Sequence, residues 1–355
     1  MVAVTGASSG IGRLLVERLL TASGSGKAAK PVAIDTERGD IEGATWRITD
    51  VRDPRLAGRL DGVDVLVHTA DDRSLETPAK ERRAANVRAA QTVLTAAAAA
   101  RVPRVVVVTG TTVYGAHPGA AVPLPEDAPL VEEAGPGIAG DHAEIEDLVR
   151  RARRGHPGLS VTVVRPAPLV GPGLDSALTR HFAAPRLLSV KGVEQEWQFC
   201  HVEDLASALE FIAVEGVDGK EGALAVGCDG ALGQAEAEEI AGLRRFELPA
   251  NLAFGTTRRL HRAGITPASA EELKFLVYPC VVDCATLRDA GWRPAYDNAA
   301  ALHALLDARS GKHALVGRTL GRKEATITAA GAAGAAVAAI GTAAAVRHLR
   351  KRRKG

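Results

Sequence analysis

The sequence has few cysteines, and this limits the sites that it can build. Four cysteines occur in 355 residues, at Cys200, Cys228, Cys280 and Cys284. The last two lack the second pair of ligands that a structural zinc site needs. We therefore expect no metal site, and we interpret the cysteines as reduced thiols of a cytoplasmic protein.

Net charge is also small. The chain carries +2 at pH 7, yet six of its last nine residues are Lys or Arg, so the part before Arg347 is mildly acidic. An acidic body argues against a nucleic-acid-binding domain, and we expect no nucleic-acid partner. The charged fraction of 24% and the hydrophobic fraction of 46% are those of an ordinary globular protein.

Two further gaps concern the middle of the chain. Tyr114 is the only tyrosine before Tyr278, and no lysine lies between Lys80 and Lys191. Any site built from residues 81–190 therefore has one tyrosine at most and no lysine.

The N-terminal residues predict a phosphate-binding loop. Residues 2–12 read VAVTGASSGIG, a short apolar run and a Gly-rich turn, and a helical pattern follows. A helix that begins there presents free N–H groups and the positive end of its dipole to a pyrophosphate. Gly6 allows the tight turn, Gly10 lets the backbone approach the phosphates, and Gly12 permits close packing of helix on strand. The expected cofactor contacts from this loop are Gly6, Ser8, Ser9, Gly10, Ile11 and Gly12.

An acidic residue follows at a suitable distance. Asp35 ends the next apolar run, 23 residues beyond Gly12. There its carboxylate can accept hydrogen bonds from the adenosine ribose and would repel a 2′-phosphate. We therefore expect NAD, with NADP less favoured, although Arg38 is near enough to weaken this preference. The alternative is a Gly-rich turn that binds no ligand.

Strand-like and helix-like segments alternate through the first half of the chain. Apolar runs at 31–35, 45–50, 63–68, 104–109 and 159–165 are separated by helical patterns such as 77–100 and 140–153. This alternation predicts βαβ units and a doubly wound parallel α/β sheet, a Rossmann fold, over residues 1–170. Residues 171–308 are less regular and show no long core pattern of their own. We expect them to form a smaller substrate lobe interleaved with the first domain.

Small and polar residues at the predicted strand ends extend the expected site. Asp50 and Val51 follow the third strand and could meet the adenine edge, although Asp50 could equally be a solvated turn residue. Thr69 and Ala70 follow the fourth strand at the carboxyl edge of the sheet, where ligands bind in such folds. Their small side chains would let a dinucleotide lie close.

The C-terminal residues allow several interpretations. We expect a basic linker over 309–324, followed by an Ala- and Gly-rich helix with a basic tail over 325–355. The uncharged stretch 325–346 would be about 33 Å long as a helix, enough for a bilayer core of roughly 30 Å. Its few large apolar residues supply only about −2 kcal/mol of insertion energy. Attachment to anionic lipid through the basic tail, or a flexible extension, are the alternatives to a span.

Taken together, these segments resemble the extended short-chain dehydrogenase/reductase family of the NAD-dependent epimerase/dehydratase type. The landmarks, in order, include TGASSGIG, VVVVTGTTVYG, VRPAPLVGPG and FCHVEDLASAL. The resemblance covers residues 1–308 and is greatest to an actinobacterial branch that is UDP-glucose 4-epimerase-like. It implies NAD as cofactor, a nucleotide sugar or similar hydroxylated substrate, and a homodimer paired through helices at 77–100 and 140–153. It also adds Asn86, Thr109, His142, Arg165 and Pro166 to the expected cofactor contacts.

The family's catalytic residues are missing from this chain. In the family a Tyr takes the substrate proton, a Lys lowers the pKa of that Tyr and holds the ribose, and a Ser or Thr orients the sugar. These positions fall here on Ile138, His142 and Gly110. Because Ile has no ionisable group, the usual residues cannot carry out the usual proton transfer.

Other side chains could replace them. His142 titrates near neutrality and could act as a base, could hydrogen-bond the nicotinamide ribose, or could be an exposed helix histidine. Thr111 could orient a ligand, and Tyr114 lies in a turn that is normally structural. Asp141 and Glu144 could act as acids, but carboxylates on a helix surface are usually solvated. The expected catalytic residues are therefore His142, Thr111 and Tyr114.

Three hypotheses follow from the sequence. The first is an NAD-dependent epimerase, dehydratase or reductase that uses a substituted acid–base group. The second is a dinucleotide-binding sensor or scaffold without turnover, which the missing Tyr and Lys favour. The third is a membrane-associated accessory protein whose active end is the tail at 325–355.

Overall fold

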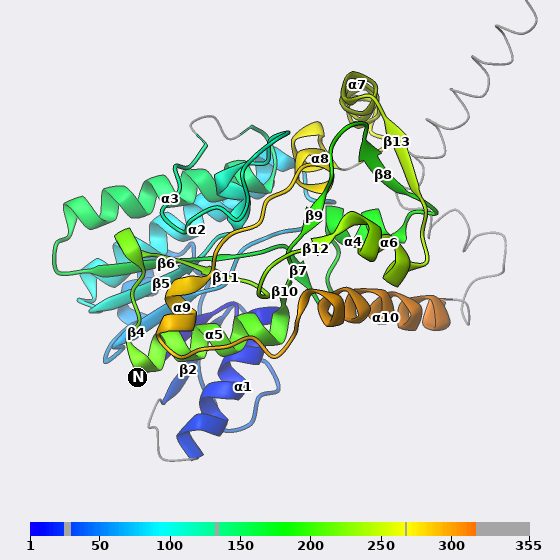
Figure 1. The fold of residues 1–355 in the computed structure, drawn as a ribbon. Helices are drawn as coiled ribbons and strands as arrows, with labels where there is room; N and C mark the ends of the chain where they lie inside the picture. The colour runs from blue at the N-terminus through cyan, green and yellow to red at the C-terminus, as the bar shows by residue number, and fades with distance from the viewer. Residues whose placement is uncertain (25–29, 132–134, 267, 317–355) are drawn as a thin grey trace, which may run out of the picture.

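A seven-stranded parallel sheet forms the centre of the computed structural model, which describes residues 1–24, 30–131, 135–266 and 268–316 (Figure 1). The strand order is β11-β6-β5-β4-β1-β2-β3, and every neighbouring pair is parallel. The strands are β1 (Val2–Thr5), β2 (Pro31–Asp35), β3 (Thr45–Ile48), β4 (Val65–His68), β5 (Arg104–Val108), β6 (Ser160–Pro166) and β11 (Ala223–Val226). The order reverses between β1 and β4, so a ligand crevice is expected at the carboxyl ends of these two strands. The predicted doubly wound α/β fold is confirmed.

Helices cover both faces of this sheet. Helices α1 (Gly10–Gly24) and α5 (Val202–Glu215) pack together on one face, and α2 (Ala79–Ala99) and α3 (Ile138–Gly155) pack together on the other (Figure 1). The run of valines in β5 explains why both faces are covered. Val106 and Val108 belong to the buried cluster under α1 and α5, whereas Val105 and Val107 belong to the cluster under α2 and α3.

The remaining described residues form a lobe beside the carboxyl edge and several connecting elements. The lobe contains α4 (Ala177–Ala183), β8 (Leu187–Val190), α6 (Gln234–Ala241), β13 (Arg245–Leu248), α7 (Ala250–Arg262), α8 (Ala270–Val277) and α10 (Asn298–Val316). The short pieces are η1 (Pro54–Arg59), η2 (Thr111–Tyr114), β7 (Leu169–Val170), β9 (Glu196–Trp197), β10 (Cys200–His201), η3 (Lys220–Gly222), β12 (Leu232–Gly233) and α9 (Ala285–Asp289). β11 and α5, although they come from residues 171–308, are part of the central layers.

The lobe has its own hydrophobic core, although residues 171–308 show no long core pattern in the sequence. Phe182, Trp197 and Phe199 are buried together, with Leu276 and Leu302 in the same cluster. The rings of Phe182 and Trp197 lie 5.1 Å apart edge to face, and those of Trp197 and Phe199 are stacked at 6.2 Å. Most of these residues lie on or beside short elements, such as β9 with two residues and α4 with seven. Elements of this length are too short to show a periodic pattern in the sequence.

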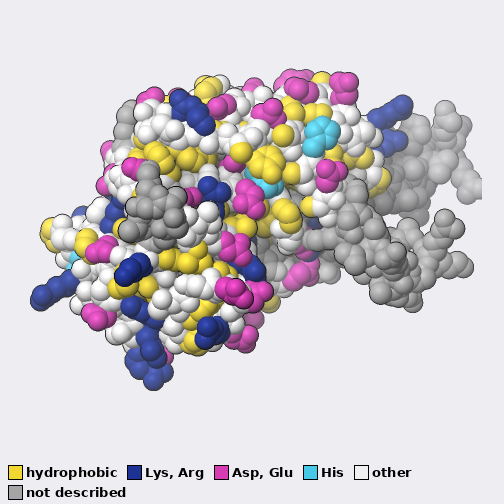
Figure 2. All heavy atoms as spheres, turned by 90° about the horizontal axis from the view of Figure 1, so that it is seen from below, with side chains coloured by type: hydrophobic (Ala, Val, Ile, Leu, Met, Phe, Trp, Pro, Cys, Tyr) yellow, Lys and Arg dark blue, Asp and Glu magenta, His cyan; other side chains and the backbone are white. Residues whose placement is uncertain are grey.

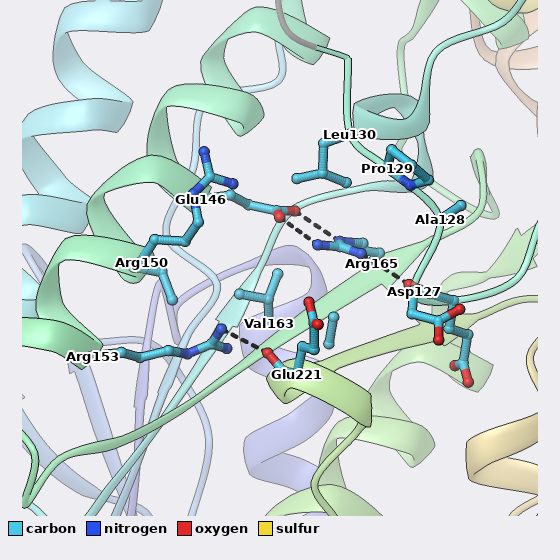
Figure 3. Close-up of a pocket in the computed structure, with 13 residues that line it drawn as sticks. Asp127, Ala128, Pro129, Leu130, Glu146, Arg150, Arg153, Val163, Arg165 and Glu221 are labelled. Atoms are coloured by element: carbon cyan, nitrogen blue, oxygen red, sulfur yellow. Dashed lines mark hydrogen bonds and ion pairs between the residues drawn. The ribbon is translucent and has the colours of Figure 1, made fainter.

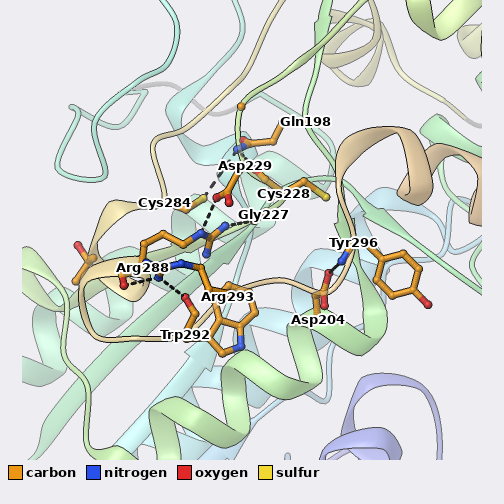
Figure 4. A network of polar contacts seen from close by, with 12 residues as sticks. Gln198, Asp204, Gly227, Cys228, Asp229, Cys284, Arg288, Trp292, Arg293 and Tyr296 are labelled. Carbon is orange, nitrogen blue, oxygen red and sulfur yellow. Dashed lines mark hydrogen bonds and ion pairs between the residues drawn. The ribbon is translucent and has the colours of Figure 1, made fainter.

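A polar network ties the segment before α10 to the central layers (Figure 4). Arg288 donates to the Asp229 carboxylate at 2.6 Å and to the Gly227 carbonyl, just beyond β11, at 2.7 Å. Asp204 in the first turn of α5 accepts the N–H groups of Ala295 and Tyr296 at 2.8 and 3.1 Å. Because these are charge-assisted hydrogen bonds, they hold the returning chain firmly against α5.

The C-terminal predictions fall largely outside the described residues. α10 continues to Val316, so helix replaces the first half of the linker expected at 309–324, while residues 325–355 are not described. No helix among the described residues is long and apolar enough to cross a bilayer. On the face seen from below, basic, acidic and hydrophobic side chains are interspersed in small groups (Figure 2).

Replacing His181 should make the lobe less sensitive to acid. Its ring packs against Phe182 and Trp197, its Nε2 has no hydrogen-bond partner, and burial lowers its pKa from 6.5 to about 4. The unfolded chain therefore binds a proton below pH 6.5 that the folded chain binds only near pH 4, so stability falls as pH drops through this window. We expect His181→Phe to remove about 2 kcal/mol of the destabilisation at pH 5.

Urea unfolding at pH 7 and pH 5 measures this effect. The exposed His156 provides the control, because His156→Phe removes an imidazole ring that is not buried. The prediction would be contradicted if the free energy of unfolding fell by the same amount from pH 7 to pH 5 in the wild-type protein and in His181→Phe.

Candidate functional site

The glycine loop is packed too closely to accept side chains. A Cβ on Gly12 would lie 2.2 Å from the Gly6 carbonyl oxygen and 2.8 Å from Thr69 Oγ1, and a Cβ on Gly6, at φ +69°, would lie 3.0 Å from Ala70 Cα. Thr69 Oγ1 donates to the Thr5 carbonyl at 2.6 Å and fixes the end of β4 against the end of β1. The structure thus brings the predicted residues Gly6, Gly12, Thr69 and Ala70 together at the start of α1. The first N–H groups of this helix face outward there and can receive an anion.

Asp35 lies beside this loop. Its Oδ2 accepts the N–H and the hydroxyl of Ser8 at 2.9 and 2.7 Å, and its Oδ1 accepts the N–H of Thr36 at 2.7 Å. Gly10 adopts φ +53° at the first position of α1, Ser9 is exposed, and Ile11 is half-buried against the core. The negative charge at the end of β2 is therefore tied directly to the turn that would hold the pyrophosphate.

Asp50 and Val51 make local contacts. Asp50 accepts from Arg52 Nη2 at 2.7 Å and Nε at 3.0 Å, and this side-chain hydrogen bonding lowers the pKa of the Asp50 carboxyl. Val51 is half-buried and packs against the cluster beneath α2. Asp50 is thus a turn residue paired with Arg52, which is nearer to the solvated turn residue of the sequence analysis than to an adenine contact.

Three further predicted cofactor contacts take part in internal hydrogen bonds. Asn86 donates to the Asp72 carbonyl and accepts the Asp72 N–H, both at 2.8 Å, and so shapes the loop after β4. Thr109 Oγ1 donates to Glu146 at 2.9 Å. Arg165 donates to the same Glu146 carboxylate at 2.6 and 3.0 Å, while Pro166 ends β6 in register with Val226.

Tyr114 belongs to the same buried network. Its hydroxyl donates to the Glu126 carbonyl at 2.6 Å and accepts from Arg165 at 2.8 Å, and the Arg165 guanidinium lies 4.9 Å from the ring centre. Burial raises the pKa of Tyr114 to about 12, even though the Arg165 charge opposes the shift. A phenol that is held in this way supports packing and is a poor proton acceptor at neutral pH.

A cavity of about 170 Å³ opens at the β6–β11 edge of the sheet, next to this network (Figure 3). Arg165 is paired with the Glu146 carboxylate, and Arg153 donates to the backbone carbonyl of Glu221 at 2.8 Å, as the dashed lines show. Arg153 also donates to the Val161 carbonyl at 2.6 Å. The cavity lies several strands from the glycine loop.

The position expected for the family's lysine is occupied by a buried histidine. His142, one turn into α3, is 2% exposed, and its Nε2 lies 3.7 Å from Asp71 Oδ2. Neither ring nitrogen has a hydrogen-bond partner, and burial lowers the pKa of His142 below 6.5 against the opposing effect of Asp71. The alternative of an exposed helix histidine is therefore wrong, and burial favours the neutral form of the ring.

Sequence analysis missed two residues of this cluster. Asp71 and Arg73 follow β4, and Arg73 donates to Asp71 at 2.6 Å and to the Thr109 carbonyl at 3.1 Å. Burial raises the pKa of Asp71, but Arg73 and His142 outweigh it and hold that pKa at about 2. The only feature of the sequence that could have indicated them is the polar run DDR at residues 71–73, which follows the carboxyl end of the predicted strand at 63–68.

The other residues around His142 divide into buried and solvated ones. Asp141, expected to be solvated, is instead 1% exposed and paired with Arg82 at 2.8 Å. Glu144 pairs with Arg83 at 2.6 Å and is half-exposed, as expected. Thr111 is buried and its hydroxyl has no partner.

The cysteines are all free and buried. Burial raises the pKa of Cys228, Cys280 and Cys284 to about 12. Among the described residues no three His, Cys, Asp or Glu side chains are grouped so that they could hold a metal ion.

A methyl group at Gly12 should disrupt the glycine loop. Because its Cβ would meet the backbone of Gly6 at 2.2 Å, we expect Gly12→Ala to destabilise the protein by about 3 kcal/mol and to abolish dinucleotide binding. Gly58→Ala is the matched control, since no atom lies within 4 Å of a Cβ there. Thermal unfolding with and without NAD measures both effects, and equal behaviour of the two variants would refute the packing argument.

Comparison with known proteins agrees with this geometry. The family model for the NAD dependent epimerase/dehydratase family matches residues 2–227. Uncharacterized proteins of Mycobacterium tuberculosis and Mycobacterium bovis are 31% identical over 258 residues, which are 70% of this chain and 66% of those proteins. The match thus spans slightly less than two thirds of the length of these relatives.

Solved structures share the fold. MoeE5 in complex with UDP-glucuronic acid and NAD aligns with a TM-score of 0.64 at 22% identity, over 88% of this chain and 99% of MoeE5. The UDP-glucose 4-epimerase of Thermotoga maritima with UDP-glucose aligns with a TM-score of 0.62 at 17% identity, over 88% of this chain and 99% of that enzyme. The family model covers more than half of the chain. The chain therefore belongs to the NAD-dependent epimerase/dehydratase family.

Proposed function

We propose that the protein binds NAD at the glycine loop and uses it to oxidise, reversibly, a secondary hydroxyl of a nucleotide sugar. The observation that carries this proposal is the loop itself. Gly6 and Gly12 leave no room for side chains, α1 begins between them at Gly10, and Asp35 is hydrogen-bonded to Ser8 in the same turn. This arrangement fits a pyrophosphate and an adenosine ribose.

The charge at the end of β2 supports NAD over NADP. Asp35 would receive the ribose hydroxyls and would lie next to the 2′-phosphate of NADP, where two negative charges repel each other. The carboxylate is half-buried, so solvent screens this repulsion only in part.

The nucleotide-sugar substrate class is supported by the structural neighbours and by the position of the lobe. MoeE5 and the Thermotoga epimerase were solved with UDP-glucuronic acid and UDP-glucose. In this chain Arg180 of α4 pairs with Glu76, in the loop after β4, at 2.5 Å. The lobe therefore stands at the edge of the sheet where the nicotinamide half of NAD would lie.

A second candidate is a dinucleotide-binding module without turnover. Its supporting observation is Ile138, which occupies the first position of α3 where the family has its tyrosine, with no lysine one turn later. Such a module would bind NAD with the same loop and the same preference.

Calorimetric titration with NAD and NADP tests cofactor binding. We expect NAD to bind at least tenfold more tightly than NADP, because the Asp35 charge acts against the extra phosphate. Asp35→Asn should reduce this ratio to about threefold or less, mainly by tightening NADP binding, since the amide keeps an acceptor for Ser8 but loses the charge.

Asp40→Asn is the matched control. Asp40 is an exposed acid near the loop, and it pairs with Arg13 of α1. It should leave the ratio unchanged. If neither NAD nor NADP bound to the wild-type protein, both candidate functions, the enzyme and the dinucleotide-binding module, would be refuted.

A further inference from the structure

The residue at the family's Ser/Thr position packs directly against a buried histidine. Gly110 follows β5 with φ −178° and ψ 156°, an extended conformation that any residue can adopt. A Cβ there would lie 3.2 Å from His142 Nδ1 and 3.6 Å from Thr112 Oγ1. Both of these polar atoms are buried and have no hydrogen-bond partner. Both atoms therefore border the position that a side chain at residue 110 would take.

On the other side of the His142 ring, the charge of Asp71 determines which nitrogen carries the proton. His142 Nε2 lies 3.7 Å from Asp71 Oδ2, and Arg73 holds this carboxylate from its other side at 2.6 Å. A carboxylate only accepts hydrogen bonds, so it favours the tautomer with the proton on Nε2. In that tautomer Nδ1 is a bare acceptor and faces the space beside Gly110.

The cluster lies where a substrate hydroxyl is expected. Asp71 follows β4 and Gly110 follows β5, so both are at the carboxyl edge of adjacent strands. His142 reaches the same edge from the first turns of α3. In doubly wound sheets ligands bind at this edge, beside the point at which the strand order reverses.

We infer that His142 is the group that takes the substrate proton in this protein, with Nδ1 as the acceptor, Thr112 as a hydroxyl partner and Asp71 as the positioning residue. The inference rests on the proposed function. When the substrate is oxidised, its O–H proton passes to Nδ1, the carbon–oxygen double bond forms, and the hydrogen on that carbon leaves with its electron pair. NAD, when bound, supplies the acceptor for this hydride. Asp71 then stabilises the imidazolium, and reduction returns the proton to the oxygen.

The surrounding charges set the pH range of this step. Burial lowers the pKa of His142, and Arg73 lowers it further, whereas Asp71 and Glu146 raise it. Oxidation needs the neutral ring, and the lowered pKa keeps the ring neutral as the pH falls through 6.5, so the rate should fall only at a pH below the ordinary histidine value. The usual tyrosine and lysine are not required for this chemistry.

Variants at positions 142 and 110 test the inference, with NAD and UDP-glucose as the probe pair. His142→Gln keeps a polar side chain but cannot hold a proton, so oxidation followed by NADH absorbance should fall by about 10²–10⁴-fold while NAD affinity changes less than threefold. Gly110→Ser should have a similar effect, because its hydroxyl would occupy the space and bond to His142. His156→Gln, at the exposed C-terminal end of the same helix, is the control and should change neither quantity.

A second measurement does not depend on turnover. In ¹⁵N NMR spectra of the histidine rings, His142 should show a protonated Nε2 and an unprotonated Nδ1, and UDP-glucose added with NAD should shift Nδ1. Asp71→Asn should weaken the preference for this tautomer. A proton on Nδ1, an unshifted Nδ1 resonance, or full activity of His142→Gln would each overturn the inference. Failure of NAD to bind in calorimetry would instead overturn the proposed function, so the two failures are distinguishable.

Discussion

The close contact between the start of α1 and the ends of β1 and β4 determines how the rest of the site is arranged. Gly12 can approach the Gly6 carbonyl only because it has no Cβ, and the Thr69 hydroxyl bonds to the Thr5 carbonyl in the same place. This contact aims the N-terminus of α1 at the carboxyl edge of the sheet. It also fixes the end of β4, from which the loop with Asp71 and Arg73 begins, so the dinucleotide loop and the histidine cluster share one support.

The differences from the family's catalytic set are physically linked. A side chain at position 110 would lie against the imidazole, since even a Cβ would be 3.2 Å from Nδ1, so Gly110 and His142 fit as a pair. The buried ring in turn has Asp71 3.7 Å from Nε2, a residue that the sequence comparison with the family gave no reason to select. Where the resemblance leads one to expect a tyrosine and a lysine, at Ile138 and His142, the structure has a different polar cluster.

The sequence predicted those features that depend on local pattern. The glycines, the strand run at 104–109 and the acid at Asp35 each act through backbone geometry or strand order, which short segments specify. The partners of buried polar groups depend on contacts between distant segments, which a local pattern does not specify. Arg165, Thr109 and Tyr114 were therefore expected at the ligand site. In the structure Arg165 and Thr109 donate to the Glu146 carboxylate, and Tyr114 donates to the Glu126 carbonyl. Asp71 was missed for the same reason, because its role depends on a histidine 71 positions away.

The energetic cost of the histidine cluster helps to separate the two candidate functions. A buried polar atom without a partner costs about 1–3 kcal/mol, and His142 Nδ1 and the hydroxyls of Thr111 and Thr112 are three such atoms. A module that only bound NAD would be more stable with an apolar residue at position 142, as it already has at Ile138. A ligand hydroxyl beside Gly110 would satisfy Nδ1 and Thr112 together. The unmet hydrogen-bonding capacity therefore favours a protein that receives a hydroxylated substrate over one that binds the dinucleotide alone.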